Sequence, residues 1–424
     1  MRQARTFPRG GIEPPDRTAL SAGIPIRNAC VPAAVVIPLA LRSGFPGQCL
    51  VRPGDTVAEG EPIGRSGGPD SIAVHASIPG RVREIGERSL ADGSSGMTVL
   101  IELEGEFAVS GQARPPAEWE KLPIAQLREC IREHGAADLS AFHPGADFLV
   151  VNAVEGEPYI TAAHRLLVER APELVTGVQI VQRILQPAAV MFGVEAGRSE
   201  ALECLGRAVE AAGLDCRIEP LQLRYPQGAE RPLLEALLGR SRAASEPGGA
   251  AVIDLASLYA IYEAVVLGKP LLERIVTVTG QAVRQPANLK VRLGTRIGDL
   301  IEECGGFSEP PARLLAGGPM MGSCQSGLEA PVTRELAGLI ALSRSEVRRT
   351  AETPCIGCGR CVSACPWSLA PVEIYKALEH GRFAEAEAAG LAECTECGCC
   401  AYVCPARIPL AAGMRRGKSA AARG

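Results

Sequence analysis

The C-terminal part of the chain contains the same cysteine pattern twice, C-x2-C-x2-C-x3-C-P. The first copy consists of Cys355, Cys358, Cys361 and Cys365, and the second consists of Cys394, Cys397, Cys400 and Cys404. Three closely spaced thiolates can hold one set of corner-sharing irons, while a fourth cysteine followed by proline points toward a second cluster. The duplicated pattern therefore predicts two [4Fe-4S] clusters with exchanged fourth ligands, and hence an electron carrier.

Exchange of the fourth ligand assigns Cys355, Cys358, Cys361 and Cys404 to one cluster and Cys394, Cys397, Cys400 and Cys365 to the other. A pair of structural zinc sites is the alternative, because C-x2-C pairs also bind tetrahedral zinc. Zinc requires neither a third cysteine three residues later nor a C-P step, so the duplicated pattern favours iron–sulfur clusters. Cys399 breaks the spacing if it replaces Cys400, and we expect it to be a small buried residue.

The composition describes a cytosolic globular protein with several domains. The chain has 424 residues, 46% of them hydrophobic, and a net charge of −4, which indicates no nucleic-acid partner. Nine of the sixteen cysteines lie between residues 355 and 404, and the other seven are scattered, as expected for reduced thiols rather than a disulfide framework. No window of eighteen uninterrupted apolar residues occurs, so we expect any membrane contact to be made through partners.

An N-terminal extension, residues 1–30, precedes an all-β module at 31–105, where short strand-like runs alternate with glycine and proline turns. The phrases V-R-P-G-D-T-V-A-E-G-E-P-I at 51–63 and H-A-S-I-P-G-R-V at 75–82 resemble the barrel-sandwich hybrid of lipoyl and biotinyl carriers. A carrier needs a lysine at a hairpin tip, but the first lysine of this chain is Lys121. We therefore expect a docking or structural module.

Residues 124–270 alternate between helical and strand patterns, which predicts a multidomain α/β protein with a parallel sheet in this region. Residues 271–350 contain strand-like runs and a helix with Thr295 as its candidate N-cap, which is typical of a small β-grasp module. The cluster domain is expected at 351–410, with one helical stretch over Val372–Ala389 between the two cysteine copies. Residues 411–424 are small and basic, and we expect a disordered tail.

The order of these modules resembles RnfC, the C subunit of the Rnf-type ion-translocating electron transport complex, over roughly residues 7 to 410. The resemblance depends on the cysteine runs and on G-G-I at 10–12, N-A-V-E-G-E-P-Y-I-T at 152–161, Y-P-Q-G-A-E at 225–230, I-Y-E-A-V-V-L-G-K-P at 261–270, V-T-V-T-G at 276–280 and G-G-P-M-M-G at 317–322. In this family the α/β domain is similar to the NADH-oxidising flavoprotein subunit of respiratory complex I. The β-grasp, or SLBB-like, module follows it there, and a two-cluster ferredoxin-like α domain ends the arrangement.

The resemblance implies an iron–sulfur electron-transfer subunit, bound peripherally to the cytoplasmic side of the cell membrane. Its partners would be membrane-embedded and cytoplasmic subunits of the complex, together with an electron donor or acceptor protein or NADH. A soluble flavin-dependent reductase, similar to cobalamin reductase, is one alternative, although that relative carries its barrel-sandwich module after the flavoprotein domain. A non-redox assembly scaffold with structural clusters is the other.

One departure from the family concerns flavin binding. The family places a glycine-rich loop of the type G-x-G-G-A-G-F-P-T before the N-x-x-E-x-E-P phrase, but here the stretch Gly135–Gly145 is short and contains only two glycines. A phosphate cradle needs several consecutive free N–H groups. We therefore expect weak or no FMN binding and no intrinsic NADH oxidation. Glu155 and Glu157 remain candidate FMN or NADH contacts, with a solvated loop or the start of a helix as the alternative.

Overall fold

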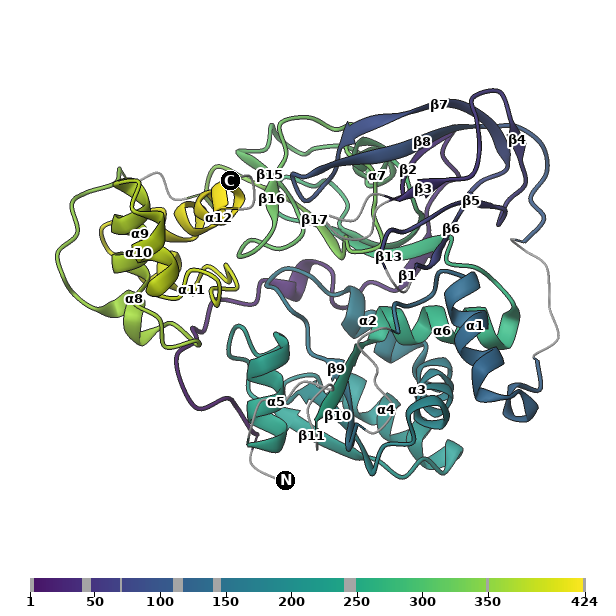
Figure 1. Cartoon of the computed structure of the whole chain (residues 1–424), viewed down its shortest axis with the longest axis horizontal. Helices are drawn as coiled ribbons and strands as arrows, with labels where there is room; N and C mark the ends of the chain where they lie inside the picture. Colours follow the sequence, from purple (N-terminus) through teal and green to yellow (C-terminus); the bar gives the residue numbers. More distant parts are fainter. Residues whose placement is uncertain are drawn as a thin grey trace.

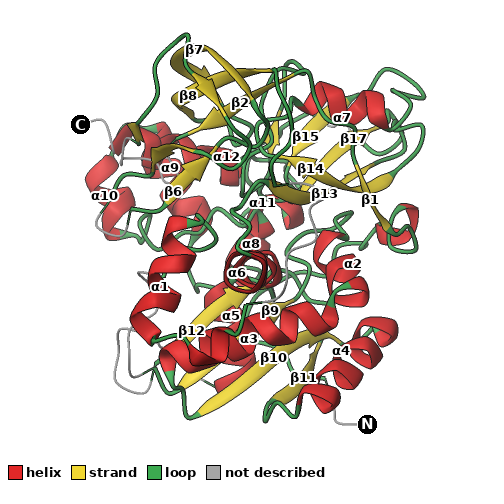
Figure 2. Cartoon of the chain, turned by 90° about the vertical axis from the view of Figure 1, so that its right-hand side faces the viewer, coloured by secondary structure: helices red, strands yellow, loops and turns green. Residues whose placement is uncertain are grey.

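The computed structural model describes residues 4–39, 47–68, 71–109, 117–139, 146–239, 249–347 and 351–421. The helical cluster domain, residues 351–421, lies at one end of the long axis of the molecule, and the barrel module lies at the other end (Figure 1). In the perpendicular view, the α/β domain occupies the lower half and the two β-rich modules lie above it (Figure 2). The N-terminal segment passes between the α/β domain and the cluster domain before it joins the β-rich half (Figure 1).

The barrel module consists of two antiparallel sheets, with strand orders β2-β8-β7-β4 and β3-β5-β6. The strands are β2 (Ala34–Pro38), β3 (Gln48–Cys49), β4 (Thr56–Val57), β5 (Pro62–Arg65), β6 (Ala73–His75), β7 (Gly80–Ser89) and β8 (Ser95–Leu103). Val35, Ile37, Val99 and Ile101 alternate along β2 and β8, and all four are buried between the sheets. Alternate residues of a strand point to the same face, and Val36 between them is also buried, so β2 is covered on both faces.

The α/β domain contains a parallel sheet of order β11-β10-β9-β12. Its elements are α1 (Ile124–Glu133), β9 (Phe148–Ala153), α2 (Ala162–Glu169), α3 (Ala171–Leu185), β10 (Ala189–Glu195), α4 (Ser199–Ala212), β11 (Arg217–Leu221), α5 (Glu230–Leu238), β12 (Ala250–Asp254) and α6 (Leu255–Leu267). Leu149 and Val151 of β9 pack into the core with α1, α3 and α6, whereas Val150 packs with α5. The sheet is therefore covered on both faces, as parallel sheets are.

The β-grasp module is a six-stranded sheet of order β1-β14-β13-β17-β15-β16, with helix α7 (Ile297–Glu303). Its strands are β1 (Ile26–Asn28), β13 (Glu273–Thr279), β14 (Ala287–Arg292), β15 (Arg313–Ala316), β16 (Ser323–Cys324) and β17 (Gly338–Leu342). The end of the N-terminal extension is thus part of this sheet, because β1 pairs with β14.

The predicted N-cap of α7 is wrong. Helix α7 begins at Ile297 after Arg296, which makes no side-chain capping bond. The Thr295 hydroxyl instead donates to the carbonyl oxygen of Arg292, 2.8 Å away. Thr295 therefore lies one residue before the N-cap position, and its hydroxyl bonds within the preceding turn.

The cluster domain contains five helices among the described residues, α8 (Arg360–Ser363), α9 (Pro371–Glu379), α10 (Phe383–Ala388), α11 (Cys399–Val403) and α12 (Leu410–Ala421). The single helix that we expected over Val372–Ala389 is therefore two helices. The break falls at Gly381, whose φ of 69° is left-handed and ends α9.

The expectation of a disordered tail at 411–424 is also wrong for residues 411–421, which form most of α12. Met414 is buried against the core of the cluster domain. Gly413 and Gly417, four residues apart, lack the side chains that would collide with Tyr375 and Leu378 of α9, so the two helices approach closely. Residues 422–424 lie outside the described part of the chain.

A buried charge network joins the three larger modules. Arg292 of the β-grasp module contacts Glu59 of the barrel module at 2.7 Å and Glu273 at 3.6 Å. Glu273 also contacts Lys269 at 2.6 Å and Lys290 at 3.2 Å. Burial alone would raise the pKa of Glu273, but the positive charges of Lys290, Lys269 and Arg292 lower it to about 2. The carboxylate therefore stays ionised where the modules contact one another.

We expect Glu273→Gln to destabilise the contact between the modules by roughly 2 kcal/mol at pH 7. The substitution removes a carboxylate from the buried cations Lys269, Lys290 and Arg292, which then share Glu263 and Glu59. A lowered folded-state pKa stabilises the fold above the unfolded value near 4.5, and this contribution disappears as the pH falls toward 2. Urea unfolding, followed by circular dichroism under anaerobic conditions, measures the effect. Glu118→Gln, which removes an exposed ion pair with Lys121, is the control and should change the midpoint little. Equal midpoints for the two variants would contradict this account.

Candidate metal centre

A cavity in the cluster domain is lined by cysteines from both copies of the pattern. Cys365 of the first copy lies there with Cys394, Cys397 and Cys400 of the second. Cys365 follows α8, Cys400 lies on α11, and these two short helices pack against each other. The structure therefore brings together the four cysteines that the spacing assigned to one cluster, including the one that comes from the other copy.

The other predicted set is more exposed. Cys361 packs against a buried group that includes Cys404, Ile408 and Leu410. The backbone N–H of Thr353 donates to the carbonyl oxygen of Ala406 at 2.9 Å, which fixes the start of the first copy beside the end of the second. Cys355 and Cys358 lie on the exposed loop before α8. The fourth cysteine of the second copy thus lies beside the first copy, as exchanged ligation requires.

The donor set fits iron–sulfur clusters. Thiolates are soft ligands that suit iron–sulfur clusters, whereas hard cations select oxygen ligands. Cys365, Cys394, Cys397 and Cys400 would hold one cluster, and Cys355, Cys358, Cys361 and Cys404 would hold the other. A bound cluster supplies one-electron transfer, and the surrounding protein sets its reduction potential by burial and hydrogen bonding.

Cys399 is fully buried, in a cluster with Ile12, Tyr225 and Ala364. Its Sγ lies 4.0 Å from the carbonyl oxygen of Tyr225, and the residue also reaches the wall of the cysteine cavity. This burial agrees with the expectation that Cys399 is a small packing residue. Its exclusion from the ligand set remains a prediction.

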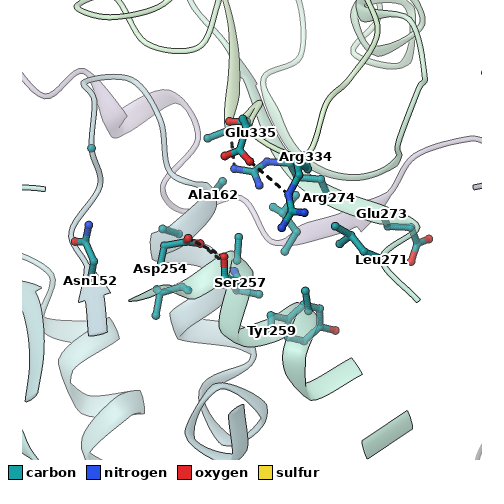
Figure 3. Close-up of a pocket in the computed structure, with 18 of the residues that line it drawn as sticks. Asn152, Ala162, Asp254, Ser257, Tyr259, Leu271, Glu273, Arg274, Arg334 and Glu335 are labelled. Atoms are coloured by element: carbon teal, nitrogen blue, oxygen red, sulfur yellow. Dashed lines mark hydrogen bonds and ion pairs between the residues drawn. The ribbon is translucent and has the colours of Figure 1, made fainter. Parts of the chain in front are cut away.

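A second cavity, of about 280 Å³, lies at the carboxyl ends of β9 and β12. Ligands of parallel α/β sheets bind at this edge. Asp254 and Ser257 of α6 and its N-cap face the cavity from one side, and Arg274, Arg334 and Glu335 of the β-grasp module face it from the other (Figure 3). This is where a nucleotide would lie if the domain bound one.

The described start of the glycine-poor segment, at Gly135 and Ala136, packs between modules. Gly135 has a φ of 64°, and a side chain there would collide with the backbone carbonyl of Ala73 in β6. The Arg334 guanidinium donates to the carbonyl oxygens of Gly135 and Ala136, at 3.4 and 3.2 Å. The described part of the loop thus turns carbonyls toward a cation, whereas a phosphate cradle needs free N–H donors. Residues 140–145 lie outside the described residues.

The two candidate cofactor carboxylates have different surroundings. Glu155 lines the 280 Å³ cavity, and its Oε1 accepts from the backbone N–H of His164 at 2.9 Å. Glu157 accepts from the backbone N–H groups of Met320 and Met321, at 2.9 and 2.8 Å. Burial raises the pKa of each carboxyl to about 7. Glu157 is therefore occupied in holding the 317–322 loop, and of the pair only Glu155 lines the larger cavity.

Sequence reasoning missed two contacts with the cysteine region, Gly10 and Tyr225. Gly10 packs against the Cys365–Pro366 step, and the Tyr225 hydroxyl donates to the carbonyl oxygen of Cys397 at 2.8 Å. Both residues belong to phrases that carried the family resemblance, but the phrases gave no indication of what they touch.

Four family models match the chain in the order of its modules. They are the RnfC barrel sandwich hybrid domain at residues 6–106, the Nuo51 FMN-binding domain at 135–263, the SLBB domain at 275–323 and the 4Fe-4S dicluster domain at 347–405. The order confirms the predicted fold class, and the last match confirms the prediction of two [4Fe-4S] clusters.

Relatives that match over most of this chain are C subunits of ion-translocating complexes. The C subunit of the proton-translocating ferredoxin:NAD(+) oxidoreductase complex of Clostridium ljungdahlii is 34% identical, over 86% of this chain and 82% of the relative. The chain belongs to the RnfC family. The C subunit of the Na(+)-translocating ferredoxin:NAD(+) oxidoreductase complex of Acetobacterium woodii is 33% identical, over 86% of each chain. The C subunit of the ion-translocating oxidoreductase complex of Rhodobacter capsulatus is 34% identical, over 90% of this chain and 77% of the relative.

Within this RnfC-family chain, exchanged ligation predicts which cluster each cysteine serves. Cys365→Ala should damage the cluster of Cys394, Cys397 and Cys400, and Cys404→Ala should damage the one beside Cys355. Cys399→Ala should leave both clusters intact. Electron paramagnetic resonance of the reduced variants distinguishes the two signals. Loss of a cluster in the Cys399 variant, or loss of the same signal in the Cys365 and Cys404 variants, would contradict the assignment.

Proposed function

We propose that this chain is the iron–sulfur electron-transfer subunit of a membrane-bound Rnf-type complex that couples electron transfer to ion translocation. The proposal depends on one observation, that Cys365 lines the same cavity as three cysteines of the other copy. It is supported by relatives whose names describe ferredoxin:NAD(+) oxidoreductase complexes. The order of modules argues against a cobalamin-reductase-like enzyme, because the barrel module precedes the FMN-binding-domain match here.

The two clusters have unequal access to partners. The set with Cys355 and Cys358 lies on an exposed loop, where the Ile356 side chain is 70% exposed. Val362 of α8 is exposed nearby in the sequence, and Arg360 lies between them. The other set lies against the α/β domain through Tyr225. We propose that the exposed cluster exchanges electrons with a protein partner, which would approach this apolar and basic surface.

We propose further that the chain is a peripheral subunit on the cytoplasmic side of the membrane. Among the described residues no helix has both the length and the apolar character needed to cross a bilayer. Attachment would then depend on membrane-embedded subunits. An alkaline carbonate wash of membranes from cells that contain those subunits should release the chain. Retention with the integral proteins after the wash would contradict peripheral attachment.

The short loop after Gly135 predicts that the isolated subunit binds FMN weakly or not at all. We expect no stoichiometric FMN after anaerobic purification and no NADH-dependent ferricyanide reduction. Dithionite should reduce the clusters of the same preparation, which controls for their presence. Flavin fluorescence after acid release and a ferricyanide assay measure the two outcomes. Stoichiometric FMN, or reduction of the clusters by NADH, would contradict the prediction, and Glu155 and Glu157 would then be the first residues to change.

A further inference from the structure

An N-terminal strap, residues Phe7–Ile12, passes directly over a cluster ligand. At Gly10, where φ is 66°, a Cβ would lie 2.5 Å from the carbonyl carbon of Cys365 and 2.6 Å from the nitrogen of Pro366. The next residue, Gly11, donates its N–H to the carbonyl oxygen of Ala364 at 2.9 Å. The strap thus touches the step at which the fourth cysteine of the first copy turns toward the other cluster.

Tyr225 of the α/β domain holds the second cysteine copy from the same side. Its hydroxyl donates to the carbonyl oxygen of Cys397 at 2.8 Å, and its side chain is buried. Its backbone N–H and carbonyl form two hydrogen bonds with Ile12 of the strap, of 2.8 and 2.9 Å. Tyr225 and the strap are therefore one unit, with a contact on each copy of the pattern.

The strap itself is anchored to the α/β domain. The Arg224 guanidinium donates to the carbonyl oxygens of Phe7, at 2.9 Å, and of Gly10. The same group lies over the Phe7 ring, 4.6 Å from its centroid, and Phe7 is buried. A cation that binds both the backbone and the ring of one short segment fixes its position. Because the strap is bound to the α/β domain and contacts Cys365, it fixes Cys365 relative to that domain.

The exposed cluster has no comparable support among the residues that the structure describes. Gly357 and Gly359 flank Cys358, and a Cβ at either position would meet no atom within 4 Å. On the inner side, the carbonyl oxygen of Met320, in the loop that Glu157 holds, would lie 3.1 Å from a Cβ at Gly398. In the described part of the chain, the strap, Tyr225 and Met320 thus approach the inner cysteine set from outside the cluster domain, whereas Cys355 and Cys358 are exposed.

We propose that Gly10 and Tyr225 are positioning residues for the inner cluster, the one held by Cys365, Cys394, Cys397 and Cys400, and this rests on the proposed function. The potential of an iron–sulfur cluster depends on burial, solvent access and nearby hydrogen bonds. A side chain at Gly10 displaces the Cys365 ligand. Loss of the Tyr225 hydroxyl leaves the buried Cys397 carbonyl without its donor. Both changes act on the inner cluster and spare the exposed one.

The test uses the full chain, purified anaerobically, as Gly10→Ala and Tyr225→Phe variants. Gly213→Ala is the matched control, because Gly213 has a similar φ of 59° but open space around its Cβ position. Iron and sulfide content, paramagnetic resonance spectra and redox titration are measured for each variant. We expect Gly10→Ala to lose or alter the inner-cluster signal. Tyr225→Phe should keep both clusters and shift only the inner midpoint potential, and Gly213→Ala should match the wild type.

Unchanged spectra and potentials in both Gly10→Ala and Tyr225→Phe would overturn the positioning role and leave the proposed function standing. Equal changes in the two clusters would also overturn it, since they would indicate a general loss of folding. A wild-type chain whose two clusters do not take up electrons would overturn both the proposed function and the inference that rests on it.

Discussion

The fold of the cluster domain depends on one requirement, that the fourth cysteine of each copy reaches the other copy. Cys365 must enter the cavity formed by Cys394, Cys397 and Cys400, which forces the short helices α8 and α11 against each other. Helices α9 and α10 connect α8 to α11 in the sequence. Helix α12 packs against α9 at the end of the domain. Bound clusters would add to the stability that the small core around Met414 gives these short helices, since metal binding contributes to folding.

The N-terminal segment extends this arrangement to the whole molecule. Arg5 donates its backbone N–H to the carbonyl oxygen of Pro220 in β11, Gly11 contacts the cluster domain, and β1 adds a strand to the β-grasp sheet. A segment that appears as a simple extension in the sequence is therefore bound to three modules in turn. This explains how a domain with exposed cysteines on one side can be fixed on the other side against a large α/β body.

Much of the fold follows from sequence periodicity, because alternating and helical patterns reflect which face of an element is buried. The parallel sheet around β9 and the barrel strands were predictable for this reason. Helix α12 was missed because its residues are small and basic, and it is held by Met414 and by two glycines that permit close packing, a signal that depends on the partner helix. The break between α9 and α10 depends on the left-handed backbone of Gly381, and the Thr295 hydroxyl bonds in the turn before α7. Hydrophobic periodicity encodes neither feature.

Some residues of the candidate site were likewise predictable from the sequence, and others were not. The eight cysteines were predictable because ligand spacing is local in sequence. The roles of Glu157 and Tyr225 were not, since both act on loops more than a hundred residues away, Met320 and Cys397 respectively. An E-x-E-P phrase specifies two carboxylates but not whether they face a ligand or a neighbouring backbone. The glycine-poor loop was visible as a departure, and its contact with Arg334 required the structure.

The central claim is that one chain holds two neighbouring clusters through exchanged cysteines. The most direct measurement is quantitative iron and sulfide analysis of the anaerobically purified full chain, combined with paramagnetic resonance of the fully reduced protein. The account predicts about eight irons and about eight acid-labile sulfides per chain, with spectra broadened by interaction between two adjacent reduced clusters. Saturation at about four irons, or uptake of zinc in place of iron, would contradict it.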